Sequence, residues 1–78
     1  MTINELKNTL KKLKIPENMY SIGIGGFPNE VYCLNFNGKK WEVYYSERGL
    51  KSGLKEFNKE EEACKYFYDK LKKYSLED

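Results

Sequence analysis

Residues 41–57, WEVYYSERGLKSGLKEF, decide the fold that this sequence predicts. Trp41, Val43 and Tyr45 alternate with more polar residues, which is the period-2 pattern of a strand with one buried face. Trp, Val and Tyr also suit a pleated surface that packs on one side. A charged segment with two glycines follows, so we expect the strand to lead into a loop over residues 47–53.

The segment before this strand supplies its partner. Residues 31–36 alternate in the same way, and the following Asn37-Gly38 is a strong signal for a β-hairpin. A two-residue turn pairs Leu34 with Trp41 and puts the large apolar side chains of both strands on one face. A four-residue loop keeps that arrangement, whereas a three-residue loop turns one strand over and buries charged residues. We therefore expect a hairpin with an even loop length.

The opposite face of this hairpin is mixed in character. It carries three side chains from each strand: Val31, Cys33 and Asn35 beside Lys40, Glu42 and Tyr44. Because half of these are apolar, we expect this face to be partly covered or to bind a partner.

Two amphipathic segments flank the strands. Thr2 and Glu5 form a capping box at the start of the first helix, and Pro16 is expected to end it. Asn58 is expected to cap the last helix, whose acidic first turn and lysine-rich last turn match the helix dipole. Residues 20–24 alternate and predict a first strand, and residues 54–57 predict a short edge strand.

These elements predict an α+β domain over residues 1–78 in the order α-β-β-β-β-α. Because the connections are short, we expect each strand to pair antiparallel with the next. The predicted architecture has two layers: a four-stranded antiparallel meander with the N- and C-terminal helices packed on one face. The glycine-rich residues 23–28 are interpreted as a tight turn or bulge, because a dinucleotide-binding loop would have to open a helix.

Composition argues against several functions. The net charge of +2, with acids and bases interspersed, falls short of the excess typical of nucleic-acid binders. The chain has no histidine and no recognisable catalytic constellation, so we expect no enzyme activity, cofactor or metal site. Cys33 and Cys64 lie in apolar patterns, which predicts buried thiols in a reducing compartment; a disulfide between them is the alternative.

Location is also predicted from what the sequence lacks. No stretch approaches the ~20 apolar residues of a membrane span, and the N-terminal segment has no apolar core of a secretory signal. We therefore expect a cytoplasmic protein without a membrane partner.

Residue types favoured at binding interfaces gather where the strand after residue 41 meets its loop. Tyr and Arg are enriched at interface hot spots. The predicted partner-binding residues are Tyr44, Tyr45, Glu47, Arg48 and Lys51. Two alternatives stay open: Glu47 to Gly49 form a turn with a local salt bridge, and the parity of Tyr45 places it in the core.

Three sequence strings carry a family resemblance: GGFPNE at residues 25–30, WEVYYSERG at 41–49 and EEEAC at 60–64. Together they resemble small Firmicute immunity proteins of polymorphic toxin systems. The resemblance implies a cytosolic protein that binds and neutralises a cognate toxin domain. We expect the protein itself to be a monomer or weak homodimer. Because this chain is slightly basic, an acidic contact with a basic nuclease toxin would be confined to a local patch.

Two further functions remain open. The lysines of the first helix (Lys7, Lys11 and Lys14) and exposed tyrosines would suit a small nucleic-acid-binding or regulatory module. A free edge of the predicted sheet would suit pairing between copies of the chain.

Overall fold

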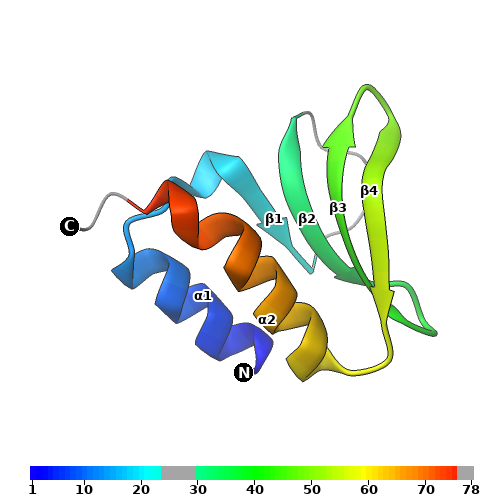
Figure 1. Ribbon diagram of the computed structural model, residues 1–78, viewed down its shortest axis with the longest axis horizontal. Helices are drawn as coiled ribbons and strands as arrows, with labels where there is room; N and C mark the ends of the chain where they lie inside the picture. Colours follow the sequence, from blue (N-terminus) through cyan, green and yellow to red (C-terminus); the bar gives the residue numbers. More distant parts are fainter. Residues whose placement is uncertain (24–29, 76–78) are drawn as a thin grey trace.

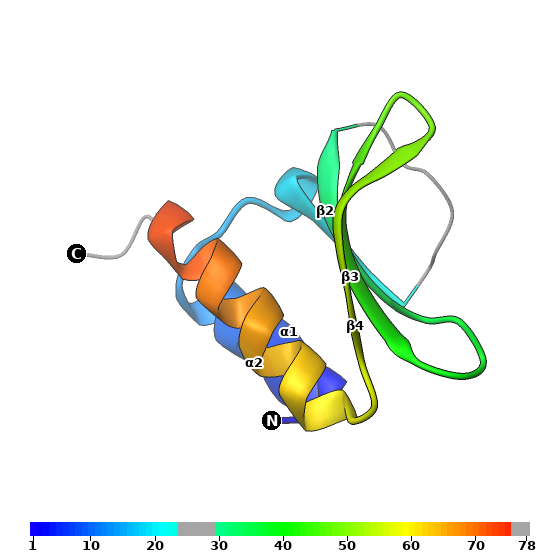
Figure 2. The ribbon, with the colours of Figure 1, turned by 45° about the vertical axis from the view of Figure 1, so that its right-hand side comes forward.

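The computed structural model describes residues 1–23 and 30–75. Within these residues, two helices lie on one side of a four-stranded sheet (Figures 1 and 2). The helices are α1 (Ile3–Lys12) and α2 (Glu60–Leu71), and the strands are β1 (Tyr20–Ile22), β2 (Val31–Phe36), β3 (Trp41–Glu47) and β4 (Leu50–Phe57). Two short 3-10 helices, η1 (Glu17–Met19) and η2 (Lys72–Tyr74), complete these elements. The α+β class is confirmed.

The helices do not contribute equally to the second layer. α2 packs directly on β2, β3 and β4, whereas α1 packs chiefly on α2. The side chains of Leu6 and Leu10 of α1 are buried in the same core as those of the sheet. In Figure 2 both helices are seen on the same side of the strands.

The sheet is mixed, so the predicted antiparallel meander is wrong at its first pair. β1 and β2 run parallel, with Tyr20 opposite Tyr32 and Ile22 opposite Leu34. A parallel connection has to return along the strand, which normally takes a dozen residues or more. β1 has only three residues and is therefore about 10 Å long. The eight residues between the two strands can span up to about 26 Å, so a parallel return is within reach.

The β2–β3 hairpin has the predicted even loop length, but with four residues rather than two. Phe36 lies opposite Trp41, and both strands keep their large apolar side chains on the helix side. The Asn37 side-chain oxygen accepts hydrogen bonds of 2.9 Å from the backbone N–H groups of Lys39 and Lys40. Those two bonds stabilise the four-residue turn over the tighter one, as Asn side chains do in turns.

β4 is longer than predicted, because the two glycines of the predicted 47–53 loop lie in a tight turn and in a bulge within the hairpin. Glu47 pairs with Leu50 across a two-residue turn, Arg48-Gly49, in which both φ angles are positive (49° and 76°). Such angles are typical of a type I′ turn, the preferred connection of tight hairpins. Gly53, with φ of 62°, lies where the β3–β4 register shifts, as in a glycine bulge.

The start of α1 agrees with the prediction, but its C-terminal end does not. The capping box of Thr2 and Glu5 is confirmed. At the other end Lys14 has φ of 58°, and the N–H of Ile15 bonds to the carbonyl of Leu10 at 3.1 Å. This is a Schellman motif, which ends the helix before Pro16 is reached.

The start of α2 also differs. Its N-cap residue is Lys59 rather than Asn58, and no side chain caps it. Instead, the Glu60 carboxylate accepts a hydrogen bond of 2.8 Å from the backbone N–H of Ile3. The first turns of the two helices are therefore fixed to each other.

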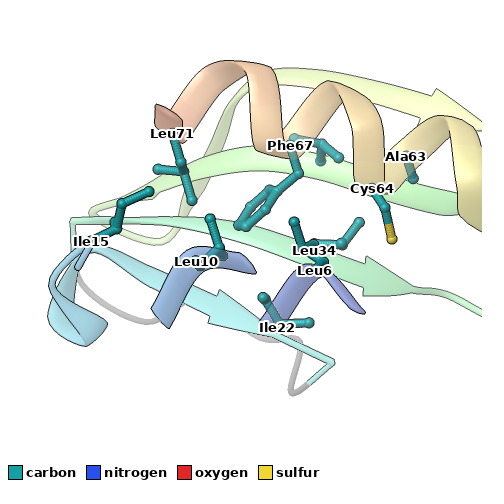
Figure 3. Packing of buried hydrophobic residues seen from close by; sticks show 10 residues of the cluster. Leu6, Leu10, Ile15, Ile22, Leu34, Ala63, Cys64, Phe67 and Leu71 are labelled. Carbon is teal, nitrogen blue, oxygen red and sulfur yellow. The ribbon is translucent and has the colours of Figure 1, made fainter. Parts of the chain in front are cut away.

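The core lies between the helices and the sheet. Figure 3 shows α2 side chains, Phe67 among them, pointing toward those of α1 and the strands. The buried cluster comprises Leu6, Leu10, Ile15, Ile22, Leu34, Val43, Ala63, Cys64, Phe67 and Leu71. Cys33 is also buried, but it pairs with Tyr44 outside that cluster. Both cysteines are free thiols, as predicted, and no disulfide joins them.

Candidate interaction surface

The five predicted binding residues do not form one surface. Tyr44 faces away from the helices, as its parity predicts, but it is only 2% exposed. The Nζ atom of Lys51 lies 4.9 Å from the centroid of the Tyr44 ring and 2.9 Å from a carboxylate oxygen of Glu42. Tyr44 and Lys51 are therefore part of a polar cluster on the far face of the sheet.

Most side chains of this far-face cluster are shielded from solvent. Glu42, Cys33 and Ser46 are buried beside Tyr44. Burial raises the pKa of Tyr44 to about 12, with further contributions from Cys33 and Glu42, and burial also raises the pKa of the Cys33 thiol. Both groups are therefore protonated at neutral pH, and Cys33 is a poor nucleophile.

The other three predicted residues lie at or near the tip of the β3–β4 hairpin. Glu47 and Arg48 are exposed there, and within the part of the chain that the structure describes they form no ion pair with each other. The local salt bridge of the alternative reading is absent from the described residues. Tyr45 is half-buried on the helix side of β3.

Tyr45 belongs to a concave surface that we call the tyrosine groove, formed by Tyr32, Tyr45, Tyr66 and Tyr74. The rings of Tyr32 and Tyr45 meet edge to face, with centroids 4.9 Å apart, and the Tyr74 ring lies 6.4 Å from Tyr32. Edge-to-face contact is a preferred geometry for aromatic pairs. All four side chains are half-buried, so each has accessible surface.

Two hollows adjoin in the groove and share Tyr32 and Tyr45. The first, about 280 Å³, is also lined by Tyr66, Lys70 and the bulge residue Gly53. The second, about 350 Å³, is lined by Tyr32, Tyr45, Tyr74, Asn18, Met19 and Glu30. Each is at the small end of the range for ligand pockets, so one side chain of a partner is a better fit than a large cofactor.

Charge is distributed unevenly along the groove. Partial burial raises the pKa of Tyr45, and the carboxylates of Glu30 and Glu47 raise it further. Burial also raises the pKa of Tyr32, followed by a hydrogen bond with Tyr74. The opposite end is basic, since Lys70 lies 5.3 Å from the centroid of the Tyr66 ring.

Most of this groove is not evident from the sequence. Tyr45 is among the predicted binding residues, whereas alternation assigns Tyr32 to the buried face of the sheet, and Tyr66 and Tyr74 are not among the predicted binding residues. Seven tyrosines in 78 residues were a signal that these rings need accessible hydroxyl groups. Which of them gather depends on how α2 and η2 lie over the sheet, and sequence spacing does not fix that.

A third hollow, about 230 Å³, lies between α1 and β1. Lys7 and Lys11 line it together with Tyr20 and the acidic Glu17. The acidic side chain reduces the positive potential that a nucleic-acid site needs.

Comparisons with known proteins give no relative: no family model, no curated protein and no solved structure matches the chain. Among residues 1–23 and 30–75, no three Cys, Asp or Glu side chains gather as a metal site would require. No helix in those ranges combines the length and apolarity needed to cross a bilayer.

Proposed function

We propose that this protein binds a cognate bacterial toxin domain stoichiometrically and neutralises it, as its resemblance to immunity proteins implies. The observation that carries the proposal is the tyrosine groove next to the exposed tip of the β3–β4 hairpin. Tyr and Arg are the residue types that most often anchor protein interfaces. Here Tyr45 joins the groove to the tip, because it is two residues from Glu47 along the same strand.

The proposed contact surface therefore comprises the groove together with Glu47 and Arg48. Arg48 is held in a left-handed conformation by the two-residue turn, so its position at the tip is fixed by the backbone. A side chain on an ordered turn costs less backbone entropy on binding than one on a flexible loop. Tyr44 and Lys51 are not part of this contact surface; they stabilise β3 through their contacts on the far face of the sheet.

The state of the thiols favours binding over covalent catalysis. Burial raises the pKa of Cys64 to about 11 and also raises that of Cys33. Thiolate, not thiol, is the nucleophile. In the proposed role, any chemistry belongs to the toxin.

The test is a pull-down of the product of the adjacent open reading frame, followed by calorimetry on the purified pair. Charge reversal at the hairpin tip, Arg48→Glu, should weaken binding about tenfold or more while the melting temperature stays within about 2 °C. Lys40→Glu is the matched control, because Lys40 is exposed in the loop at the other end of β3. Its affinity should equal that of the unmodified protein.

Two results would count against the proposal. One is that the neighbouring product does not bind; the other is that Arg48→Glu and Lys40→Glu bind equally well. A salt-sensitive mobility shift with single-stranded RNA, lost in a Lys7→Glu/Lys11→Glu variant, would favour the nucleic-acid role instead.

A further inference from the structure

We propose that the acidic half of the tyrosine groove binds the guanidinium group of an arginine side chain from the partner protein. This proposal rests on the proposed function only for the source of the arginine. The site itself is the 350 Å³ hollow lined by Tyr32, Tyr45, Tyr74, Asn18, Met19 and Glu30.

Three aromatic rings form the walls of this hollow. Tyr32 contacts Tyr45 edge to face at 4.9 Å, and Tyr74 lies 6.4 Å from Tyr32 at an angle of 43°. The rings therefore present differently inclined surfaces to one space. A cation within about 6 Å of such a ring face is attracted by the ring quadrupole, and arginine is the side chain most often found there.

Negative charge adjoins the rings. The carboxylates of Glu30 and Glu47 both raise the pKa of Tyr45, so both act on its hydroxyl group. Glu30 lines the hollow directly, and Glu47 is two residues along β3 from Tyr45. Within the described residues neither carboxylate takes part in an ion pair. An incoming cation would therefore meet two carboxylates that no lysine or arginine of the described residues neutralises in an ion pair.

Other tyrosines of the chain already hold cations in this way. Lys70 lies over Tyr66, Lys72 over Tyr68 and Lys73 over Tyr74, at 5.3 to 5.9 Å from the ring centroids. In the described part of the chain, Tyr32 and Tyr45 hold no such lysine or arginine. Both rings line the hollow, so a cation from outside the chain can lie against them.

Arginine fits better than lysine for two reasons. Its planar group can stack on one ring while its N–H groups reach a carboxylate and a carbonyl or amide oxygen. Glu30 and Asn18, whose side chains carry these two kinds of acceptor, both line the hollow. A lysine ammonium is smaller and more strongly hydrated, so it gains less from a hollow with three ring walls.

The experiment is an NMR titration of the full chain, with labelled backbone amides and tyrosine rings. The probe is N-acetyl-arginine-amide, and the matched controls are N-acetyl-lysine-amide and N-acetyl-norleucine-amide. We expect saturable shifts centred on Tyr32, Tyr45 and Tyr74 with arginine, weaker binding of lysine and no saturable shift with norleucine.

Two variants separate the site from the general charge of the protein. Glu30→Gln should weaken arginine binding about threefold, which is the size expected of one exposed charge pair. Glu61→Gln removes an exposed carboxylate from the first turn of α2, on another part of the surface, and should change nothing. Because Glu30 is exposed, its substitution should leave the fold intact.

Equal binding of norleucine and arginine, or shifts spread evenly over the protein, would overturn the proposal. Equal binding of lysine and arginine would overturn the assignment to guanidinium. These outcomes are independent of the toxin hypothesis. If the protein binds the arginine probe but not the neighbouring gene product, the arginine site is supported and the proposed function is not. If it binds the gene product but not the probe, the proposed function is supported and the arginine site is not.

Discussion

The Nζ atom of Lys51 lies 2.9 Å from Oε1 of Glu42, a carboxylate whose side chain is only 8% exposed. The same amino group lies over the ring of Tyr44. Lys51 is thus the cation that allows an acidic residue to be buried on the far face of the sheet. Burying a carboxylate without such a partner would be costly.

Lys51→Met should therefore destabilise the fold, even though the substitution keeps most of the apolar stem. We expect a loss of about 2 kcal/mol, below the full value for a buried pair because Lys51 retains some solvent contact. Urea denaturation measures it. Lys55→Met, at an exposed lysine of the same strand, should change the free energy of unfolding by less than about 0.5 kcal/mol. Similar effects at both positions would show that the Glu42 contact contributes little.

Arg48 allows stability and binding to be separated. It is a non-glycine residue with φ of 49° at the first central position of the turn, where Asn is much better tolerated. Arg48→Asn should raise the free energy of unfolding by up to about 1 kcal/mol while removing the proposed binding side chain. Arg48→Val should lower it, because a β-branched residue fits this conformation poorly. Thermal unfolding of the three proteins gives the order.

The sequence predicted the faces of the strands better than their ends. Alternation places Trp41 and Val43 on the helix side whatever the loop length, provided it is even, and the structure agrees. Gly53 was assigned to a loop, because a glycine with positive φ is needed by loops and bulges alike. Only pairing with β3 distinguishes the two uses, and the residues around Gly53 do not by themselves reveal that pairing.

The same limit applies to Tyr44 and to the direction of β1. Parity puts Tyr44 on the far face, but whether that face is covered depends on the rest of the chain. Short connections favour antiparallel pairs, but β1 has only three residues, so a short connection can return along it and allow a parallel pair. The tyrosine groove likewise could not be predicted from the sequence, since its rings meet only through the relative placement of β2, β3, α2 and η2.

Trp41 and Phe67 should differ in their importance for stability. Phe67 is fully buried between the layers, whereas Trp41 is half-buried and packs on the exposed Phe36, with ring centroids 5.0 Å apart. Phe67→Ala should cost about 3–5 kcal/mol, the usual range for a buried aromatic. Trp41→Ala should cost less, about 2 kcal/mol, because part of its surface stays in water. Urea denaturation of both variants tests the order, and a larger loss at Trp41 would contradict it.

Ser46 is a polar residue whose side chain is buried in the sheet. Its side chain is 0% exposed, and its Oγ atom has no hydrogen-bond partner among the described residues. An unsatisfied buried hydroxyl group costs about 1–3 kcal/mol. Ser46→Ala should therefore leave stability unchanged or raise it by about 1 kcal/mol. Ser52→Ala, at an exposed site on β4, is the control and should have no such effect. A clear loss of stability in Ser46→Ala would mean that the hydroxyl group is satisfied in solution.

Alkaline pH should unfold this protein through its buried neutral acids. Burial raises the pKa of Cys64 from 9.0 to about 11 and that of Tyr44 from 10.0 to about 12. In both cases the folded state favours the protonated form, so the stabilisation is complete below the unfolded-state pKa and is lost as pH rises through the folded-state value. The free energy of unfolding should thus fall between pH 9 and 11 for Cys64 and between pH 10 and 12 for Tyr44.

The slope against pH, rather than the absolute stability, is the measurement that tests this. Each group should contribute a decrease of up to about 2–3 kcal/mol over its window. Cys64→Ala should flatten the curve between pH 9 and 11, and Tyr44→Phe should flatten it between pH 10 and 12, even if both variants start from a lower stability. Urea denaturation at half-unit steps from pH 8 gives both slopes. A curve that is the same in the variants and the unmodified protein would show that neither group is buried as described.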